Sequence, residues 1–194
     1  MVSIPWFHNL KVSNSKKEKS SKLERIGFIS RISPEKGLEI LLESIVKVNN
    51  LLEIDIKLTV AGDMSSDYAK QLMKRFKSLD IEWLGWLEAD SLTEVYEKID
   101  MLIVPSISYD NGPITIMEAI ATKTPVVVSD NETLTTYLKN IKTLHTFESG
   151  SSDDLANLII QYVKNPHLLN EYISEMPSPV TVDKYVDELI KIYQ

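Results

Sequence analysis

The stretch Asp110-Asn111-Gly112-Pro113-Ile114-Thr115-Ile116-Met117-Glu118 decides the fold of this 194-residue chain, because it joins an apolar run to a helix. The apolar run covers residues 99–104 and is closed by Pro105. Such a run is typical of a strand buried on both faces of a parallel sheet. After it we predict a turn and then a helix, with Asn111 as N-cap and Pro113 in the first turn.

The predicted helix places two carboxylates near its start. Asp110 lies at the mouth of the helix, and Glu118, eight positions on, lies inside it. Ligands of parallel sheets bind beyond the carboxyl ends of the strands, where helix N-termini offer free N–H donors to anions. We therefore predict a ligand site at this edge. An apolar stripe at helical spacing is expected to face the sheet: Ile114, Met117, Ile120 and Ala121.

Strand-like and helix-like segments alternate on both sides of this stretch. The predicted strands cover residues 25–30, 57–61, 81–86, 99–104, 124–130 and 142–147. The predicted helices cover residues 34–49, 66–77, 91–98, 152–164, 165–175 and 181–193, besides the one that follows Pro113. The alternation predicts an α/β fold, a Rossmann-like parallel sheet flanked by helices on both faces.

Composition excludes several classes of function. Hydrophobic residues make up 43% of the chain, enough for one good core. The net charge of −7 argues against nucleic acid as a partner, because phosphate binding needs a basic face. No apolar run approaches the roughly 18 residues that span a bilayer, and no signal-peptide core is visible at the amino terminus. Cysteine is absent, which excludes thiolate chemistry, and we expect a cytoplasmic location.

Two basic residues follow the first predicted strand. Arg31 leaves the strand end, while Ser33 as cap and Pro34 as first residue begin a helix that carries Lys36 in its first turn. Both cations can therefore point at one anion held over the helix N-terminus. The alternative is an ordinary surface arginine and lysine that share no ligand.

Several motifs together resemble one known family. They are Val-Pro-Ser at 104–106, the stretch from Asp110 to Ala121, and Thr-Pro-Val-Val-Val-Ser-Asp at 124–130. They resemble the donor-binding signature of the family 4 (group 1) glycosyltransferases of the GT-B fold. That family usually has two glutamates separated by seven residues. Here the first acid is Asp110, shorter by one methylene, and Glu118 matches the second.

The resemblance, which covers roughly residues 24–165, implies roles for these residues. Arg31 and Lys36 would hold the diphosphate of a nucleotide-sugar donor. Asp110 would accept from a sugar hydroxyl near the reacting centre, and Glu118 from the ribose hydroxyls. The catalytic set is then Asp110, Arg31 and Lys36. Backbone N–H groups would complete the sugar contact from Asn111, Gly112 and Ile114, whereas Pro113 has none to offer.

The end of the third predicted strand is also similar to the family. There the nucleobase lies against the backbone of a strand that ends in glycine, which is Gly85 here. Trp86 can offer its ring to the base, although an aromatic residue at a strand end is more often a packing residue.

Two departures and several absences limit what the resemblance carries over. Lys123 and residues 131–133 stand where the family has a glycine and a Gly-Gly turn, so the choice of hexose is not carried over. There is no Asp-x-Asp and the three histidines lie far apart, so we expect no metal and no cofactor, only a UDP-, GDP- or other nucleotide-sugar substrate. His8, His145 and His167 are interpreted as surface or packing residues. Glycoside hydrolysis needs acids across a sugar from each other, not on one helix start.

The sequence thus predicts the donor-binding half of a retaining GT-B hexosyltransferase acting on a glycan, lipid or other acceptor. Residues 1–23 would be the remnant of an interdomain linker, 24–176 the nucleotide-sugar-binding domain and 177–194 a crossover helix. We expect little turnover from this chain alone, because the acceptor domain is missing. A non-catalytic partner subunit and a sugar-nucleotide epimerase fragment stay open. The lysine-rich linker is expected to be solvated, with at most weak attraction to a membrane surface.

Overall fold

A computed structural model describes residues 22–108, 114–132, 134–135, 145–176, 186–187 and 189–191. The described strands form one six-stranded sheet in the order β3-β2-β1-β4-β5-β6. Every neighbouring pair in this sheet is parallel. The predicted α/β fold with a Rossmann-like sheet is therefore confirmed.

The elements agree with the predicted ones in order and type. The strands are β1 (Arg25–Ile29), β2 (Lys57–Ala61), β3 (Ile81–Gly85), β4 (Met101–Val104), β5 (Val126–Ser129) and β6 (His145–Phe147). The helices are the 3-10 turn η1 (Pro34–Lys36), α1 (Leu38–Leu52), α2 (Asp67–Arg75), α3 (Ala89–Lys98), α4 (Ile114–Ala121), α6 (Ser152–Lys164) and α7 (His167–Glu175).

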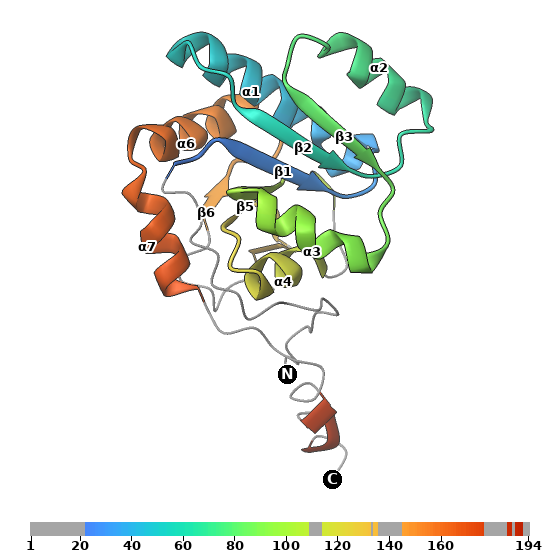
Figure 1. The fold of residues 1–194 in the computed structure, drawn as a ribbon, viewed down its shortest axis with the longest axis vertical. Helices are drawn as coiled ribbons and strands as arrows, with labels where there is room; N and C mark the ends of the chain where they lie inside the picture. Colours follow the sequence, from blue (N-terminus) through green and yellow to red (C-terminus); the bar gives the residue numbers. More distant parts are fainter. Residues whose placement is uncertain are drawn as a thin grey trace.

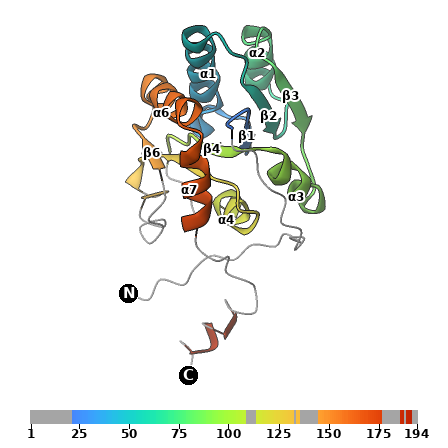
Figure 2. The same cartoon turned by 60° about the vertical axis from the view of Figure 1, so that its left-hand side comes forward.

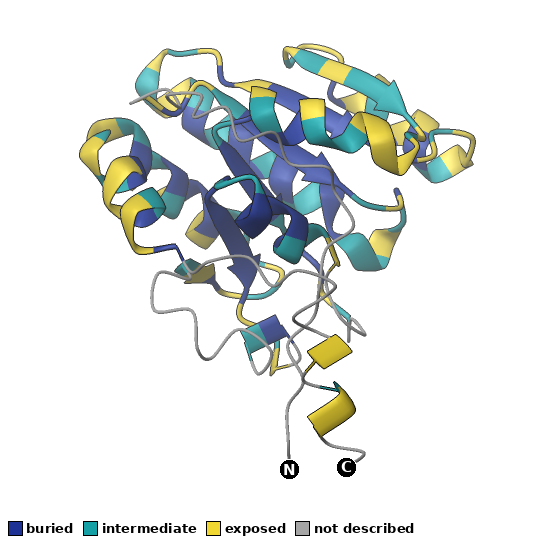
Figure 3. Cartoon of the chain, turned by 60° about the horizontal axis from the view of Figure 1, so that its bottom comes forward, coloured by how far each residue is buried: buried dark blue, intermediate teal, exposed yellow. Residues whose placement is uncertain are grey.

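Helices cover both faces of the sheet. Figure 1 shows α1 and α2 on one face and α3 and α4 on the other. Helix α6 packs against α1, and the turned view in Figure 2 shows the two side by side. At the start of β5, helix α7 is fastened by the Tyr172 hydroxyl, which donates to the carbonyl of Val126 at 2.7 Å. The sheet and the helix faces toward it form the buried centre in Figure 3.

The start of α1 differs from the prediction. Ser33 does not cap a continuous helix, because its hydroxyl donates to the Glu35 carboxylate at 2.6 Å and makes no capping bond. Pro34 begins a separate 3-10 turn that ends at Lys36, and Gly37 then adopts a left-handed φ of 71° before α1 begins. Lys36 therefore lies on a short turn in front of α1, not in its first turn. The predicted buried face of α1 is confirmed, since it holds Leu38, Leu41, Leu42, Ile45 and Val48.

Two other local predictions are wrong. Helix α3 begins at Ala89, so Ser91 lies within its first turn and is not its cap. Ile114 was expected to face the sheet, yet 56% of it is exposed. Ile116 and Ala119 are fully buried in its place, because the face of α4 that meets the sheet is rotated from the predicted one.

The ends of the chain are described only in part. The predicted last helix, 181–193, lies mostly outside the described residues, although 186–187 and 189–191 are helical. On it Val186 and Ile190 are 43% and 49% exposed. Among the described helices, none combines the length and the apolar character needed to cross a bilayer. The predicted boundaries at residues 23 and 176 remain predictions.

Candidate functional site

The strand order places the two strands that precede the predicted site residues side by side at the centre of the sheet. From β1 the chain moves to β2 and β3 on one side, and from β4 it moves to β5 and β6 on the other. The neighbours β1 and β4 are thus the point where the winding reverses. In doubly wound sheets this switch point opens a crevice at the carboxyl ends of the strands, where ligands bind. The predicted basic residues follow β1, and the predicted acidic stretch follows β4.

The segments after these two strands touch. We call residues 31–37 the basic turn and residues 105–108 the rim segment. The backbone N–H of Ile107 donates to the carbonyl of Glu35 at 3.0 Å. Gly37 packs so closely on the rim segment that a Cβ there would lie 1.9 Å from the carbonyl oxygen of Pro105. The structure therefore brings the predicted cations to the same rim as the chain that leads into Asp110.

A hollow of about 420 Å³ opens beside the basic turn. It lies at the carboxyl ends of β1, β2 and β3 and is lined by Arg31, Ile32, Ser33, Asp63, Ser66 and Trp86. Asp63, Ser33 and Ser66 were not predicted as site residues. Their signal was present in the sequence, because each follows the end of a predicted strand by a few positions.

The basic turn has its own counter-charge. The Arg31 side chain is 70% exposed, and its guanidinium lies 3.7 Å from the Glu35 carboxylate. The hydrogen bond from Ser33 lowers the pKa of Glu35, and the nearby cations lower it further. An exposed ion pair of this kind contributes little stability, so Arg31 can exchange Glu35 for a stronger anion at small cost. Lys36 is partly buried on the same turn.

Two glycines, each next in sequence to a residue that lines the hollow, fix the backbone at the ends of β2 and β3. Gly62 donates its backbone N–H to the carbonyl of Gly85 at 2.8 Å, and a Cβ at Gly62 would lie 2.1 Å from the carbonyl oxygen of Ser30. Gly85 adopts a left-handed φ of 73°, which turns the chain out of β3. Trp86 follows it and is 69% exposed, so it is not a packing residue of the core. Its ring is free to meet a flat ligand in the hollow.

The acidic side of the site is described only in part. Asp110, Asn111, Gly112 and Pro113 lie outside the described residues. Ile114 is the first residue of α4, and the backbone contact predicted for it remains a prediction.

Glu118 is nearly buried, with 6% of its surface exposed. The hydroxyl of Tyr96 on α3 donates to Glu118 Oε2 at 2.8 Å. Burial raises the pKa of Glu118, and the hydrogen bond from Tyr96 opposes that rise. Tyr96 was missed in the sequence, because a tyrosine in the middle of a helix carries no signal of such a partner.

The Asn131 side chain forms a hydrogen bond with the rim segment. Its amide nitrogen donates to the carbonyl of Ser106 at 2.9 Å, and its amide oxygen accepts from the backbone N–H of Leu134 at 3.0 Å. Ser129 adds a short hydrogen bond to the same Ser106 carbonyl. Asn131 therefore caps a helical turn and holds the chain that leads into Asp110. The sequence showed only that residues 131–133 depart from the family's Gly-Gly turn.

We expect Asn131→Ala to destabilise the fold by about 1–2 kcal/mol, because it removes a helix cap and leaves a carbonyl of buried Ser106 with one partner fewer. Urea unfolding measures this loss. Asn165→Ala is the matched control, since Asn165 makes one exposed bond to the Gln161 carbonyl, and it should cost less than about 0.5 kcal/mol. Equal losses in the two variants would contradict the role given to Asn131.

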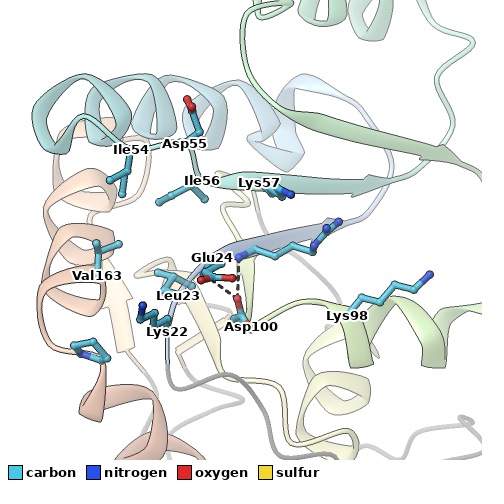
Figure 4. A pocket seen from close by; sticks show the side chains of 12 residues that line it. Lys22, Leu23, Glu24, Ile54, Asp55, Ile56, Lys57, Lys98, Asp100 and Val163 are labelled. Atoms are coloured by element: carbon cyan, nitrogen blue, oxygen red, sulfur yellow. Dashed lines mark hydrogen bonds between the residues drawn. The ribbon is translucent and has the colours of Figure 1, made fainter.

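A second hollow, of about 500 Å³, lies at the opposite edge of the sheet. Figure 4 shows it at the start of β1, between the turn before β2 and the end of α3. The Asp100 carboxylate accepts hydrogen bonds from the backbone N–H groups of Glu24 and Arg25 at 2.9 and 2.8 Å. It therefore stabilises the backbone at the start of β1. Basic and acidic side chains both line this hollow, so its walls do not carry charge of one sign. It is not at the switch point, and the predicted site residues are absent from its walls.

Within the described residues, no group of three or more histidines and carboxylates is placed to hold a metal ion. His145 packs between two tyrosines, with its Nδ1 2.6 Å from the Tyr162 hydroxyl, and burial lowers its pKa. This agrees with its interpretation as a packing residue. His167 is exposed, and His8 lies outside the described residues.

A parallel sheet that winds outward in both directions from β1 and β4, with helices on both faces, defines the Rossmann-like class of α/β domain. The family model "Glycosyl transferases group 1" matches residues 11–177. This chain therefore belongs to the group 1 glycosyltransferases.

Individual relatives agree with this assignment. An uncharacterized glycosyltransferase of Methanocaldococcus jannaschii is 35% identical over 107 residues, covering 53% of this chain and 26% of that protein. A phosphatidyl-myo-inositol mannosyltransferase of Mycobacterium leprae is 26% identical, covering 76% of this chain and 39% of that protein. The chain thus spans well under half the length of these relatives.

A solved structure shows the same fold. TarM of Staphylococcus aureus, as a variant in complex with fondaparinux, alpha-GlcNAc-glycerol and UDP, superposes with a TM-score of 0.75. It is 18% identical, and the match covers 95% of this chain and 38% of TarM.

Proposed function

We propose that this chain is the donor-binding half of a retaining GT-B glycosyltransferase of family 4, which binds a nucleotide-diphosphate sugar and transfers its hexose to a glycan, lipid or other acceptor. One observation carries the proposal. The basic turn after β1 and the rim segment after β4 are joined at the switch point by the Ile107 to Glu35 hydrogen bond. This contact between two distant parts of the sequence supports a shared site for the cations of the basic turn and the acids that follow the rim segment.

The geometry supports specific roles for these side chains. Arg31 and Lys36 would neutralise the diphosphate, whose negative charge grows as the bond to the anomeric carbon breaks. Cations that bind more tightly to this developing charge than to the ground state accelerate the step. Asp110 and the N–H groups of Asn111, Gly112 and Ile114 would hold the sugar, and Glu118 the ribose. No metal or cofactor enters this proposal.

Transfer itself needs the second half of the enzyme. We propose that an acceptor domain closes over the rim, excludes water and orients the acceptor, so that this chain alone turns over little donor. We place the activity in the cytoplasm. Contact with a membrane surface would be weak and lost at high salt.

Isothermal titration calorimetry of the 194-residue chain with UDP, GDP and their hexose conjugates tests the proposal directly. We expect one site for one of the two bases, with no requirement for a divalent ion. Absence of heat with all of these ligands at millimolar concentration would contradict it. Binding without transfer after a cognate acceptor domain is added would favour the non-catalytic partner instead. Release of free nucleotide and an epimerised sugar would favour the epimerase.

Trp86→Ala should weaken nucleotide binding by about tenfold, because the exposed ring loses its stacking surface for the base. Trp86→Phe, which keeps a ring, should lose less. Both variants should unfold within about 0.5 kcal/mol of the native chain, since Trp86 is 69% exposed. Unchanged affinity in the alanine variant would remove Trp86 from the proposed base site.

A further inference from the structure

The carboxylate of Glu118 is held on one side only. Tyr96 donates to Oε2, and within the part of the chain that the structure describes no hydrogen bond reaches Oε1. Yet the residue is only 6% exposed. A buried carboxylate oxygen without a donor is costly, so an ordered water or a ligand is expected to supply one.

The Tyr96 side chain is well suited to fix this carboxylate. Tyr96 is fully buried, and its hydroxyl lies 2.8 Å from Glu118 Oε2 and 3.2 Å from the carbonyl oxygen of Thr115. Burial, and then the charge of Glu118, raise the pKa of Tyr96 well above its ordinary value, so the phenol stays protonated and remains a donor.

The backbones that carry these two side chains are also joined. Thr124 donates from its hydroxyl to the carbonyl of Tyr96 at 3.0 Å. The hydroxyls of Thr122 and Thr124 lie 3.0 Å apart, and Thr122 in turn donates to the carbonyl of Glu118 at 3.0 Å. The bond from Thr124, which lies just after α4, therefore joins the last turn of α3 to the segment that ends α4.

We propose that Tyr96 is a positioning residue of the donor site: it holds Glu118 Oε2 so that Oε1 is directed at a pair of neighbouring hydroxyls, those of the donor's ribose. This inference rests on the proposed function. It goes beyond it by assigning a role to a side chain of α3 that does not itself contact the nucleotide.

The test compares the native chain with Tyr96→Phe by calorimetry, using UDP and GDP and their 2′,3′-dideoxy counterparts. Loss of a hydrogen bond to a charged group should weaken binding of the ribonucleotide about tenfold. Binding of the dideoxy nucleotide, which lacks the hydroxyls that Glu118 accepts from, should be unchanged. A structural defect alone would weaken both ligands alike.

The pH profile gives a second readout. Only the ionised carboxylate is a full acceptor, so ribonucleotide affinity falls as the pH drops through the pKa of Glu118. In the described structure Tyr96 is the titratable group in contact with this carboxylate, and its hydrogen bond lowers that pKa. In Tyr96→Phe the fall should therefore begin at a higher pH than in the native chain. Replacement of Tyr96 by 3-fluorotyrosine, a stronger donor of nearly the same shape, should move the fall to a lower pH.

Tyr172→Phe is the matched control, because Tyr172 is also buried and also loses one hydrogen bond, to the carbonyl of Val126. It should leave both affinities and the pH profile unchanged. If the native chain binds neither UDP nor GDP, the proposed function fails. If the native chain binds while Tyr96→Phe keeps the native affinity and pH profile, or loses affinity equally for both ligands, the positioning role is wrong and the proposed function stands. If Tyr96→Phe does not fold, the pH profile of the 3-fluorotyrosine chain tests the positioning role. A profile identical to that of the native chain would contradict it.

Discussion

The double variant Arg31→Ala, Lys36→Ala is expected to bind nucleoside diphosphate about a hundredfold more weakly than the native chain. Each cation supplies a charge-assisted hydrogen bond to phosphate, and two such losses at one site amount to at least two factors of ten. Both residues lie on the basic turn, where Arg31 makes an exposed ion pair with Glu35. Titration of UDP and GDP followed by calorimetry measures the loss.

The control for this variant removes the same charge elsewhere. Lys74 and Lys77 lie at the end of α2 and just after it, and both are exposed. Their double replacement by alanine lowers the net charge equally, and we expect native affinity. If the two double variants lose the same amount, general electrostatic attraction accounts for binding and the basic turn holds no specific site. A single Arg31→Lys replacement should recover part of the affinity, because a point charge remains but the planar fork is lost.

Gly37→Ala is expected to destabilise the fold by about 2–5 kcal/mol. This is the largest loss of stability that we expect from a single substitution near the rim. Its left-handed φ of 71° costs an alanine about 1–2 kcal/mol. The added Cβ would lie 1.9 Å from the carbonyl oxygen of Pro105, so the rim segment must also move away from the basic turn. Urea unfolding measures the loss of stability. Weaker nucleotide binding by the folded fraction would report the displacement of the rim segment.

Gly150→Ala separates these two causes. Gly150 also has a left-handed φ, 84°, but no atom lies within 4 Å of the position that its Cβ would take. It should therefore lose only the conformational part, about 1–2 kcal/mol, and keep native affinity. A Gly37→Ala chain no less stable than Gly150→Ala would show that the contact with Pro105 does not hold the rim together.

The sequence was sufficient for the architecture because its signals are local and repeated. Apolar runs such as residues 101–104 are buried on both faces, and the face of α1 from Leu38 to Val48 shows a clear helical period. Parallel pairing then follows from the alternation of strands with helices. The rim position of Arg31 follows as well, since strand ends in a parallel sheet share one edge.

The sequence did not predict the details that depend on contacts between distant residues. The close contact of Gly37 is with Pro105, which lies 68 positions away along the chain. The partner of Glu118 is Tyr96 on a different helix, and the support of the rim segment is Asn131 on a different strand end. Ile114 was expected inside because its spacing fitted a stripe, although α4 turns Ile116 inward instead. Such choices are made by packing, not by periodicity.

The central claim is that a nucleoside diphosphate binds at the rim between β1 and β4. Backbone amide shifts of the ¹⁵N-labelled chain, followed while UDP or GDP is added, test it most directly. We expect the largest shifts at residues 31–37, 62–66, 85–87, 105–108 and 114–118, and none at the hollow of Figure 4. Shifts concentrated instead at residues 22–25, 54–57 and 98–100, or absent everywhere at millimolar nucleotide, would contradict the account.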